Sequence, residues 1–242
     1  MQDATNIPLY SIVIPCKNEE GSIVNLISEV EEVMHAVKDP WELICIEDGS
    51  TDGTQPLLRM LKKHKPYLRL ICFTKNFGQS SGFAAGFEAA KGEWVITMDG
   101  DGQNDPQDIP ILLREKECFD LVCGVRQKRQ DTWTKRGISR IANAIRGWLC
   151  ADGMEDTGCS LKLMRRSCLA HIKMYQGMHR FLPALFLLEG FRIGQVPVHH
   201  RPRKHGKSHY HLFNRSWNTI ADLLAVYWMR KRRLCHQGKE VL

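Results

Sequence analysis

The 242 residues of the chain include 34 Lys and Arg and 27 Asp and Glu, giving a formal net charge of +7, and 43% of them are hydrophobic. A chain of this size and composition can bury a core without disulfides, so we expect one domain at residues 8–211 and an extension at residues 212–242. Its nine cysteines form no Cys-x-x-Cys pair and no apolar leader opens the chain, which excludes a secreted disulfide framework, the usual zinc spacing and a signal peptide.

Apolar runs typical of buried strands alternate with helical patterns from residue 10 to residue 125. Strands are expected at residues 10–15, 41–46, 67–74, 93–98 and 120–125. Apolar residues at helical spacing predict helices at residues 23–37, from residue 57, and at residues 80–92, the last closed by Gly92. A helix near residues 137–149 and a strand at residues 192–198 follow. This order predicts an α/β fold with a mainly parallel central sheet and helices on both faces.

Polar clusters follow four of the expected strands. They are Pro15 to Glu19, then Asp48, then Asp99 with Asp101, and finally Arg126. The carboxyl ends of parallel strands share one edge of the sheet, and ligands bind outside that edge. "DGDG" at residues 99–102 is also a common turn sequence. Because the four clusters fall on one edge, we favour a binding site over four unrelated turns.

The pair of aspartates after the fourth expected strand is suited to hold a metal ion. Asp99, Asp101 and Gln103 offer hard oxygen ligands, which suit Mg²⁺ or Mn²⁺ bound together with substrate phosphates. Gly100 lets backbone and phosphate approach closely. Asp48 would accept hydrogen bonds from a base or ribose, and the alternative for this residue is an Asx-turn.

The ordered segments "SIVIPCKNEE", "IEDGSTDGT" and "MDGDGQNDP" resemble the family 2 glycosyltransferases, which have the GT-A fold. Downstream, "VCGVRQ", "DTGCSLKLMRR" and the stretch from Met178 to Tyr210 are similar to the dolichol-phosphate mannosyltransferase branch, which includes bacterial polyprenyl-phosphate glycosyltransferases. The resemblance implies an inverting enzyme that moves a sugar from GDP-mannose or a UDP-hexose to a polyprenyl or dolichyl phosphate, with Mg²⁺ or Mn²⁺ as cofactor. A soluble family 2 enzyme acting on a hydroxyl acceptor is the alternative.

The resemblance also implies a role for each matching residue. The nucleotide-sugar would contact Pro15, Lys17, Glu19, Ile46, Asp48, Asp99, Gly100, Asp101, Arg126, Arg203, Lys207 and His209. The metal would be held by Asp99, Asp101 and Gln103, and the acceptor phosphate by Arg126 and Arg140. Asp99, Asp101, Arg126 and Asp156 would be catalytic, with Asp156 acting as a base or as a ligand of the sugar beside Thr157.

Three positions depart from the family pattern. Lys17 stands where many relatives have an aromatic residue, Glu47 replaces an Asp, and His209 replaces a Lys that touches the diphosphate. Histidine is mostly uncharged at pH 7, so Lys207 or Lys204 would supply the missing charge. The five histidines at residues 199–211 suggest either a basic loop beside a membrane or, as the alternative, a zinc site.

Basic residues are concentrated at residues 201–233, which indicates an acidic partner such as phosphate, nucleic acid or an anionic membrane. Aromatic and apolar residues from Trp217 to Trp228 form one helical stripe, followed by "MRKRR". Such a stripe suits a membrane interface, and the alternative is packing against the chain's own domain. The longest apolar run is about half of the ~20 residues that a spanning helix needs. We therefore expect a peripheral protein at the cytoplasmic face of a membrane, which self-associates or uses an anchoring subunit. No sequence motif supports a nucleic-acid-binding protein, the second alternative.

Overall fold

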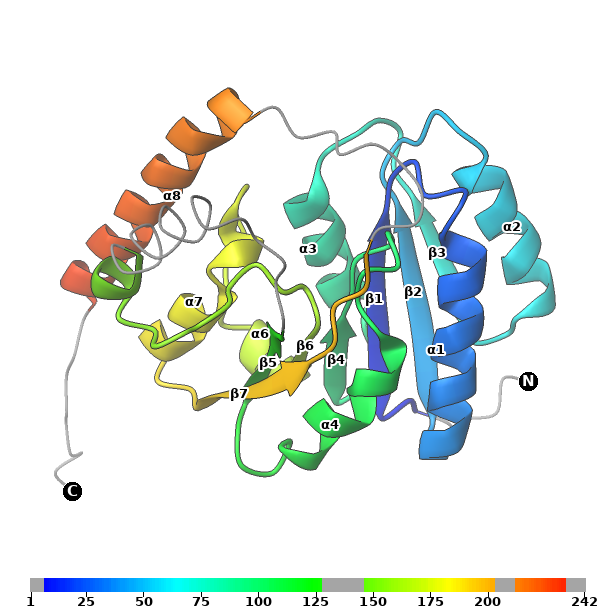
Figure 1. The fold of residues 1–242 in the computed structure, drawn as a ribbon, viewed down its shortest axis with the longest axis horizontal. Helices are drawn as coiled ribbons and strands as arrows, with labels where there is room; N and C mark the ends of the chain where they lie inside the picture. Colours follow the sequence, from blue (N-terminus) through cyan, green and yellow to red (C-terminus); the bar gives the residue numbers. More distant parts are fainter. Residues whose placement is uncertain (1–6, 128–145, 203–211, 234–242) are drawn as a thin grey trace, which may run out of the picture.

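The computed structural model describes residues 7–127, 146–202 and 212–233, of which residues 212–218 are described by their backbone alone (Figure 1). Its strands are β1 (Tyr10–Cys16), β2 (Trp41–Glu47), β3 (Leu68–Cys72), β4 (Trp94–Thr97), β5 (Leu121–Arg126), β6 (Lys162–Arg165) and β7 (Ile193–Val198). Its helices are α1 (Ile23–Val37), α2 (Thr54–His64), α3 (Gln79–Ala89), α4 (Ile109–Arg114), α6 (Arg166–Leu169), α7 (Leu182–Leu188) and α8 (Leu212–Arg232), with short 3₁₀ turns η1 (Pro106–Asp108) and η2 (Met178–Arg180).

The strands form one seven-stranded sheet in the order β3-β2-β1-β4-β6-β5-β7. β1 pairs in parallel with β2 and β4, β2 with β3, and β5 with β7. β6 lies between β4 and β5 and runs antiparallel to both. The prediction of a mainly parallel sheet is confirmed, and the antiparallel β6 is the strand that the sequence pattern did not reveal.

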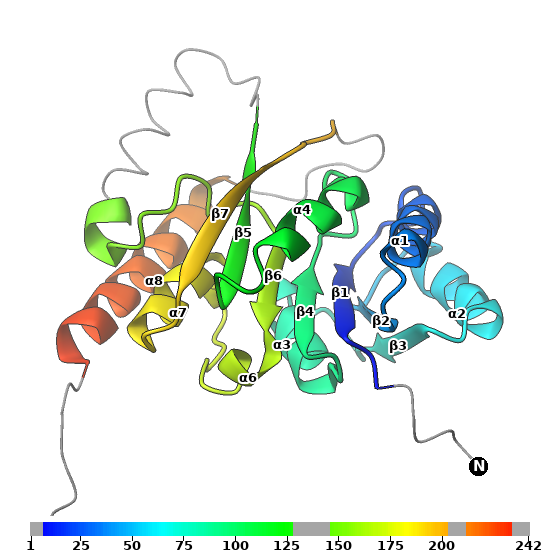
Figure 2. The ribbon, with the colours of Figure 1, turned by 90° about the horizontal axis from the view of Figure 1, so that it is seen from below.

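Helices cover both faces of the sheet, as predicted (Figure 2). Successive side chains of a strand point to opposite faces, so in β1 Ile12 and Ile14 pack in one core cluster and Val13 in the other. The first cluster contains buried residues of α1, α2 and α4, and the second contains buried residues of α3, α6 and α7. Burial on both faces explains why the strands read as continuous apolar runs.

The C-terminal helix α8 packs on the outside of α7. Val226 is fully buried and lies in a third apolar cluster with Phe181 and Leu185. None of the described helices is both long and apolar enough to span a bilayer. The proposed division between residues 211 and 212 coincides with the start of α8 and stays a prediction.

Some sequence-based boundaries are corrected by the structure. α3 ends at Ala89, so Gly92 does not close it. Instead the Gly92 N–H donates to Ser11 Oγ at 2.8 Å, and a Cβ on Gly92 would lie 2.7 Å from the Ser11 backbone nitrogen. Gly92 is therefore required for close approach to β1. The helix expected at residues 137–149 lies mostly outside the described residues, and residues 146–150 are helical.

Candidate active site

A polar pocket lies beyond the end of β4, at the edge of the sheet where the sequence predicted a site. Its walls come from α3, from the loop after β4, from the loop that leads into β6, and from η2 with the start of α7. The residues that line it are Gln79, Phe83, Thr97, Asp99, Asp101, Gln103, Thr157, Gly158, Cys159, Ser160, Lys162, His179, Arg180 and Leu182. The three predicted metal ligands thus line one pocket.

Asp99 and Asp101 are held in place by the loop itself. The Asp99 N–H donates to Asn104 Oδ1 at 3.0 Å, and Asp99 Oδ1 accepts a hydrogen bond from Gln79 Nε2 at 2.6 Å. Asp101 Oδ1 accepts from the backbone N–H of Gln103 at 3.0 Å. Burial, and then the charge of Asp101, raise the pKa of Asp99 to about 6. Two carboxylates that repel one another in this way form a site that favours a cation.

The donor set fits a divalent metal that is bound jointly with a substrate. Within the part of the chain that the structure describes, no group of three His, Cys, Asp or Glu side chains could hold a metal ion. Asp99, Asp101 and the amide of Gln103 offer only part of a coordination shell. Mg²⁺ is commonly bound by one or two carboxylates and completes its shell with water and substrate phosphates.

The predicted nucleotide-binding residues of β1 lie beside the aspartate loop. A Cβ on Gly100 would lie 3.2 Å from the Pro15 carbonyl oxygen and 3.4 Å from Glu19 Cγ. The Ser22 hydroxyl lies 2.9 Å from both Glu19 Oε2 and the Gly100 carbonyl oxygen, which joins the start of α1 to this loop. Lys17 lies in the same turn and is half-buried. Pro15, Glu19 and Gly100 are therefore brought together, as the sequence predicted.

Ile46 and Asp48 are engaged inside the protein. The Ile46 side chain is fully buried under α3, so a base could contact only the backbone of this residue. The prediction that Ile46 contacts the nucleotide-sugar is therefore limited to a backbone contact. Asp48 Oδ1 accepts from the Phe77 N–H at 2.6 Å, and Oδ2 accepts from the Gly78 N–H at 2.9 Å. Asp48 thus holds the loop before α3, and this long-range contact differs from the Asx-turn considered above. A base contact by Asp48 stays a prediction.

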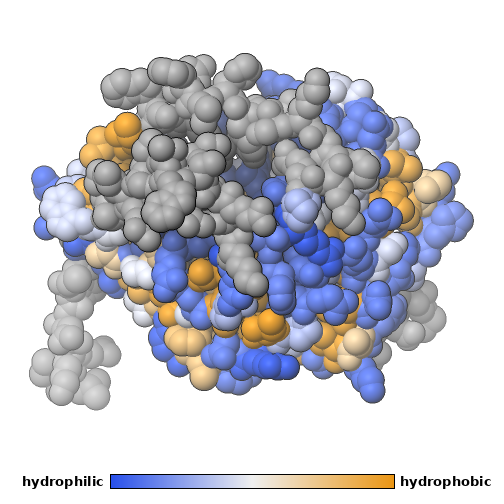
Figure 3. All heavy atoms as spheres, in the orientation of Figure 1, coloured by the Kyte–Doolittle hydropathy of each residue, from blue (hydrophilic) through white to orange (hydrophobic). Residues whose placement is uncertain are grey.

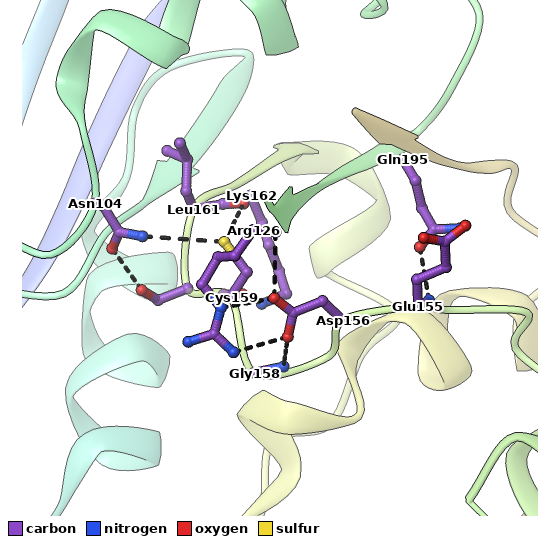
Figure 4. Close-up of polar contacts among 10 residues, drawn as sticks. Asn104, Arg126, Glu155, Asp156, Gly158, Cys159, Leu161, Lys162 and Gln195 are labelled. Atoms are coloured by element: carbon purple, nitrogen blue, oxygen red, sulfur yellow. Dashed lines mark hydrogen bonds and ion pairs between the residues drawn. The ribbon is translucent and has the colours of Figure 1, made fainter. Parts of the chain in front are cut away.

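Arg126 and Asp156 are paired with each other (Figure 4). Arg126 Nε donates to Asp156 Oδ2 at 2.6 Å and Arg126 Nη2 to Oδ1 at 2.8 Å, while the Gly158 N–H donates to Oδ1 at 3.0 Å. Burial alone would raise the pKa of Asp156, but its hydrogen bond and ion pair with Arg126 outweigh burial and hold that pKa below its ordinary value. Asp156 is therefore a weaker base than an ordinary aspartate, and its role as a base or as a ligand of the sugar stays a prediction.

The loop that carries Asp156 is tied to the end of β4. Thr97 Oγ1 donates to the Ser160 carbonyl oxygen at 2.6 Å, and Ser160 Oγ donates to Asn104 Oδ1 at 2.6 Å. Lys162 is buried and donates from Nζ to the Cys159 carbonyl oxygen. The positive charge of Lys162 partly offsets the rise in the Asp99 pKa. β6 therefore supplies a buried cation to the floor of the pocket.

His179 and Arg180 line the pocket, although the sequence analysis gave them no function. His179 Nδ1 lies 2.6 Å from Ser80 Oγ, and the Gly177 N–H donates to the same oxygen at 2.9 Å, which joins η2 to α3. Arg180 Nη1 donates to Thr219 Oγ1 of α8 at 3.3 Å. The available signal was a His-Arg pair just before a helix, inside a stretch that carried the family resemblance.

Four predicted residues, Arg140, Arg203, Lys207 and His209, lie outside the described residues. The segment that leads to three of them is anchored at the pocket, because the Arg201 N–H donates to the Gln103 carbonyl oxygen at 3.0 Å. The Arg201 guanidinium also pairs with Asp105 at 2.6 Å. His199 Nδ1 lies 2.8 Å from Asp108 Oδ1, which is an ion pair when His199 is protonated. The zinc alternative gains no support among the described histidines.

The chain is similar to known proteins both in sequence and in fold. The model described as "Glycosyl transferase family 2" matches residues 11–173. Dodecaprenyl-phosphate galacturonate synthase of Rhizobium johnstonii is 39% identical over 93% of this chain and 70% of its own length. Undecaprenyl-phosphate 4-deoxy-4-formamido-L-arabinose transferase of Salmonella choleraesuis is 34% identical over 97% of this chain and 72% of its own length. In fold, the chain is similar to glucosyl-3-phosphoglycerate synthase of Mycobacterium tuberculosis, solved with Mn²⁺, UDP and phosphoglyceric acid. The TM-score is 0.67 and the identity 18%, and the match covers 94% of this chain and 80% of that chain.

Proposed function

The chain belongs to glycosyl transferase family 2, and on that premise we propose that it transfers a sugar from a nucleoside-diphosphate sugar to a polyprenyl phosphate. The observation that carries the proposal is the pocket that gathers Asp99, Asp101 and Gln103 at the carboxyl end of β4, together with the cationic side chains of Lys162 and Arg180. The names of both bacterial relatives contain a polyprenyl phosphate together with a sugar.

We propose Mg²⁺ or Mn²⁺ as the cofactor, held by Asp99, Asp101 and Gln103. When bound, such an ion neutralises charge on the departing diphosphate. Pro15, Lys17, Glu19 and the backbone near Gly100 would bind the nucleotide beside it. Both carboxylate oxygens of Asp48 accept hydrogen bonds from the loop before α3, so this residue would act mainly by positioning that loop beside the nucleotide.

The chemistry needs little help from a general base. A phosphate monoester has its second pKa near ~6 and is mostly ionised at pH 7. Asp156, whose pKa is lowered by Arg126, suits the positioning of Arg126 better than proton removal. Cationic side chains that hold the two phosphates in a fixed place then stabilise the charge that moves during transfer.

We also propose that α8 touches the cytoplasmic face of an anionic membrane. Ile220, Leu224 and Trp228 follow one another at intervals of four residues and are 48%, 54% and 63% exposed. Figure 3 shows hydrophobic atoms at the edge of the molecule over α8. Basic residues follow the stripe: Arg230, Lys231, Arg232 and Arg233. Such a surface suits peripheral binding, with self-association or an anchoring subunit as a further means of attachment.

The test is a panel of GDP-mannose, UDP-hexoses, a UDP-hexuronate and a UDP-pentose, each with Mg²⁺ or Mn²⁺ and a polyprenyl phosphate. We expect one donor class to give a glycolipid and an equal amount of released nucleoside diphosphate. Addition of EDTA should stop the reaction. Transfer to a soluble hydroxyl acceptor with no use of any lipid phosphate would replace this proposal with the alternative function.

A further inference from the structure

We propose that Arg180 binds the phosphate of the lipid acceptor, and that the exposed stripe of α8 (Ile220, Leu224 and Trp228) guides the lipid chain to it. This inference rests on the proposed function, since it assigns the acceptor side of the same pocket. It adds a residue to those that the sequence predicted for the acceptor phosphate, which were Arg126 and Arg140.

Arg180 lies on a different wall of the pocket from the metal-binding aspartates. Asp99 and Asp101 enter from the end of β4, whereas Arg180 enters from η2, just before α7. A reaction that joins two phosphate-bearing substrates needs a cation for each phosphate. The β4 wall supplies the metal ligands for the donor, which leaves the η2 wall for the acceptor. A guanidinium offers paired N–H donors that match the oxygens of a phosphate.

Arg126 is less suited to this task in the structure. Its guanidinium makes two hydrogen bonds to Asp156, at 2.6 and 2.8 Å. A phosphate that took these donors would leave the mostly buried Asp156 carboxylate without its partner, which is costly. Arg126 lies beside the pocket lining, because a Cβ on Gly158 would be 2.7 Å from Arg126 Nη2. It therefore fits better as a residue that positions the loop before β6.

The contacts of Arg180 connect the pocket to α8. Arg180 Nη1 donates to Thr219 Oγ1, and Thr219 directly precedes Ile220, the first described residue of the exposed stripe. Asp222 lies close enough for the charge of Arg180 to lower its pKa, although burial is the larger effect and the pKa of Asp222 is raised. One turn of α8 thus faces Arg180 on one side and bears an exposed apolar side chain on another.

The fit between η2 and α8 is tight. A Cβ on Gly177, just before η2, would lie 2.0 Å from Asp222 Oδ2. α8 therefore fixes the turn from which Arg180 extends. A polyprenyl chain lying along the stripe in the membrane surface would end near Thr219, and its phosphate would be within reach of Arg180. The same helix would in this way bind the membrane and set the position of the acceptor phosphate.

The experiment compares two acceptors, a full-length polyprenyl phosphate in anionic vesicles and a short, water-soluble isoprenyl phosphate in solution. Loss of a hydrogen bond to a charged group costs about 1.5–3 kcal/mol, which is about 10- to 150-fold. We expect Arg180→Gln to raise the KM of both acceptors by about this factor and to leave the calorimetric affinity for UDP with Mn²⁺, or for GDP with Mn²⁺, unchanged. Arg180→Lys should recover part of the loss.

Three further variants separate phosphate binding from folding and membrane contact. Arg192→Gln removes an exposed arginine that pairs with Asp120 outside the pocket, and should leave both acceptors unaffected. Thr219→Val keeps the guanidinium and should cost less than Arg180→Gln. Leu224→Ser with Trp228→Ser should impair the vesicle acceptor far more than the short acceptor.

Several results would overturn the inference. If Arg180→Gln leaves the KM of the short acceptor unchanged while the wild-type protein is active, Arg180 does not bind the acceptor phosphate. If Thr219→Val is as damaging as Arg180→Gln, or if Arg180→Gln weakens nucleotide binding equally, its effect is structural. If the wild-type protein transfers no sugar to any polyprenyl phosphate, the proposed function itself fails, and this inference fails with it.

Discussion

Asp99 and Asp156 are two carboxyl groups near one pocket whose acidities the fold moves in opposite directions. Burial and the nearby Asp101 raise the pKa of Asp99 to about 6, whereas the bidentate contact with Arg126 holds that of Asp156 below its ordinary value. A carboxyl group that resists ionisation gains most from a bound cation, and one that is already paired gains least. The difference supports a metal at Asp99 and a positioning role for Asp156.

The raised pKa of Asp99 predicts how stability depends on pH. Its folded value of about 6 exceeds its ordinary value of 3.8, so its stabilising contribution is full below about pH 4 and is lost as the pH rises through about 6. As the pH rises from 5 to 7.5, the melting temperature of the metal-free wild-type protein should therefore fall relative to that of Asp99→Asn. Mn²⁺ with the nucleoside diphosphate should stabilise the wild-type protein but not Asp99→Asn. If the difference in melting temperature between the two proteins stays the same at every pH, the pKa assignment is contradicted.

Asp101→Asn tests the metal site by activity. The variant keeps an oxygen that can accept the Gln103 N–H, so it should fold normally. Loss of the charge should lower metal-dependent turnover by about 100-fold or more. The measurement is the rate of nucleoside diphosphate release over a range of Mn²⁺ concentrations. Asp39→Asn, which changes a carboxylate near the amino end of β1, is the matched control. Near-normal turnover in Asp101→Asn would remove this residue from the metal site.

At the scale of elements, α3 packs so closely on the sheet that glycine is needed at the contact. A Cβ on Gly86 would lie 2.2 Å from Val13 Cγ1 and 3.1 Å from Ile46 Cδ1. We expect Gly86→Ala to lower the free energy of unfolding by about 1–3 kcal/mol, because a fully packed core must shift to admit the methyl group. Urea unfolding measures the change. Gly147→Ala, where nothing lies within 4 Å of the added Cβ, should not be destabilising. Equal stability of both variants would contradict the packing seen here.

α8 combines a packed face with an exposed one, so it packs against its own domain and also leaves part of its apolar stripe exposed, as the proposed membrane contact requires. Val226 is buried against the cluster that contains Leu185, while Leu224 and Trp228 remain exposed. The helical period predicted the apolar stripe, but it could not show which apolar residues face the domain. That choice depends on contacts with α7, whose Leu185 lies about forty positions before Val226 in the sequence.

The basic end of α8 predicts salt-dependent binding to membranes. Arg230 donates to the carbonyl oxygens of Trp148 and Leu149, so the test variant leaves this residue unchanged. Replacing Lys231, Arg232 and Arg233 by Gln should reduce co-sedimentation with anionic vesicles, and the remaining binding should depend less on salt. Nucleotide binding, measured by calorimetry, should not change. If both proteins sediment equally with anionic vesicles at low salt, these three charges do not contribute to docking.

Across the whole molecule, the sequence predicted what depends on local pattern. Continuous apolar runs marked five of the seven strands, β7 was also predicted, and turn residues after β4 marked Asp99 and Asp101. β6 was missed because it has only four residues and inserts antiparallel between β4 and β5. The Arg126–Asp156 pair joins residues 30 positions apart, and Arg180 reaches the pocket through contacts with α8. Such long-range partners leave no periodic signal in a single sequence.

The arrangement of the whole site predicts the stereochemistry of the product. Donor ligands at the end of β4 and the proposed acceptor ligand on η2 lie on separate walls of one pocket, which suits direct attack of the lipid phosphate on the anomeric carbon. The new bond joins a phosphate oxygen to that carbon while the bond to the nucleoside diphosphate breaks, so the configuration should invert. An α-linked donor should give a β-linked glycosyl phosphate, and NMR of the product's anomeric centre measures this. Free polyprenol, which has no phosphate for Arg180, should not replace the polyprenyl phosphate. An α-linked product would contradict the single displacement, and equal use of the free alcohol would contradict the proposed phosphate site on the η2 wall.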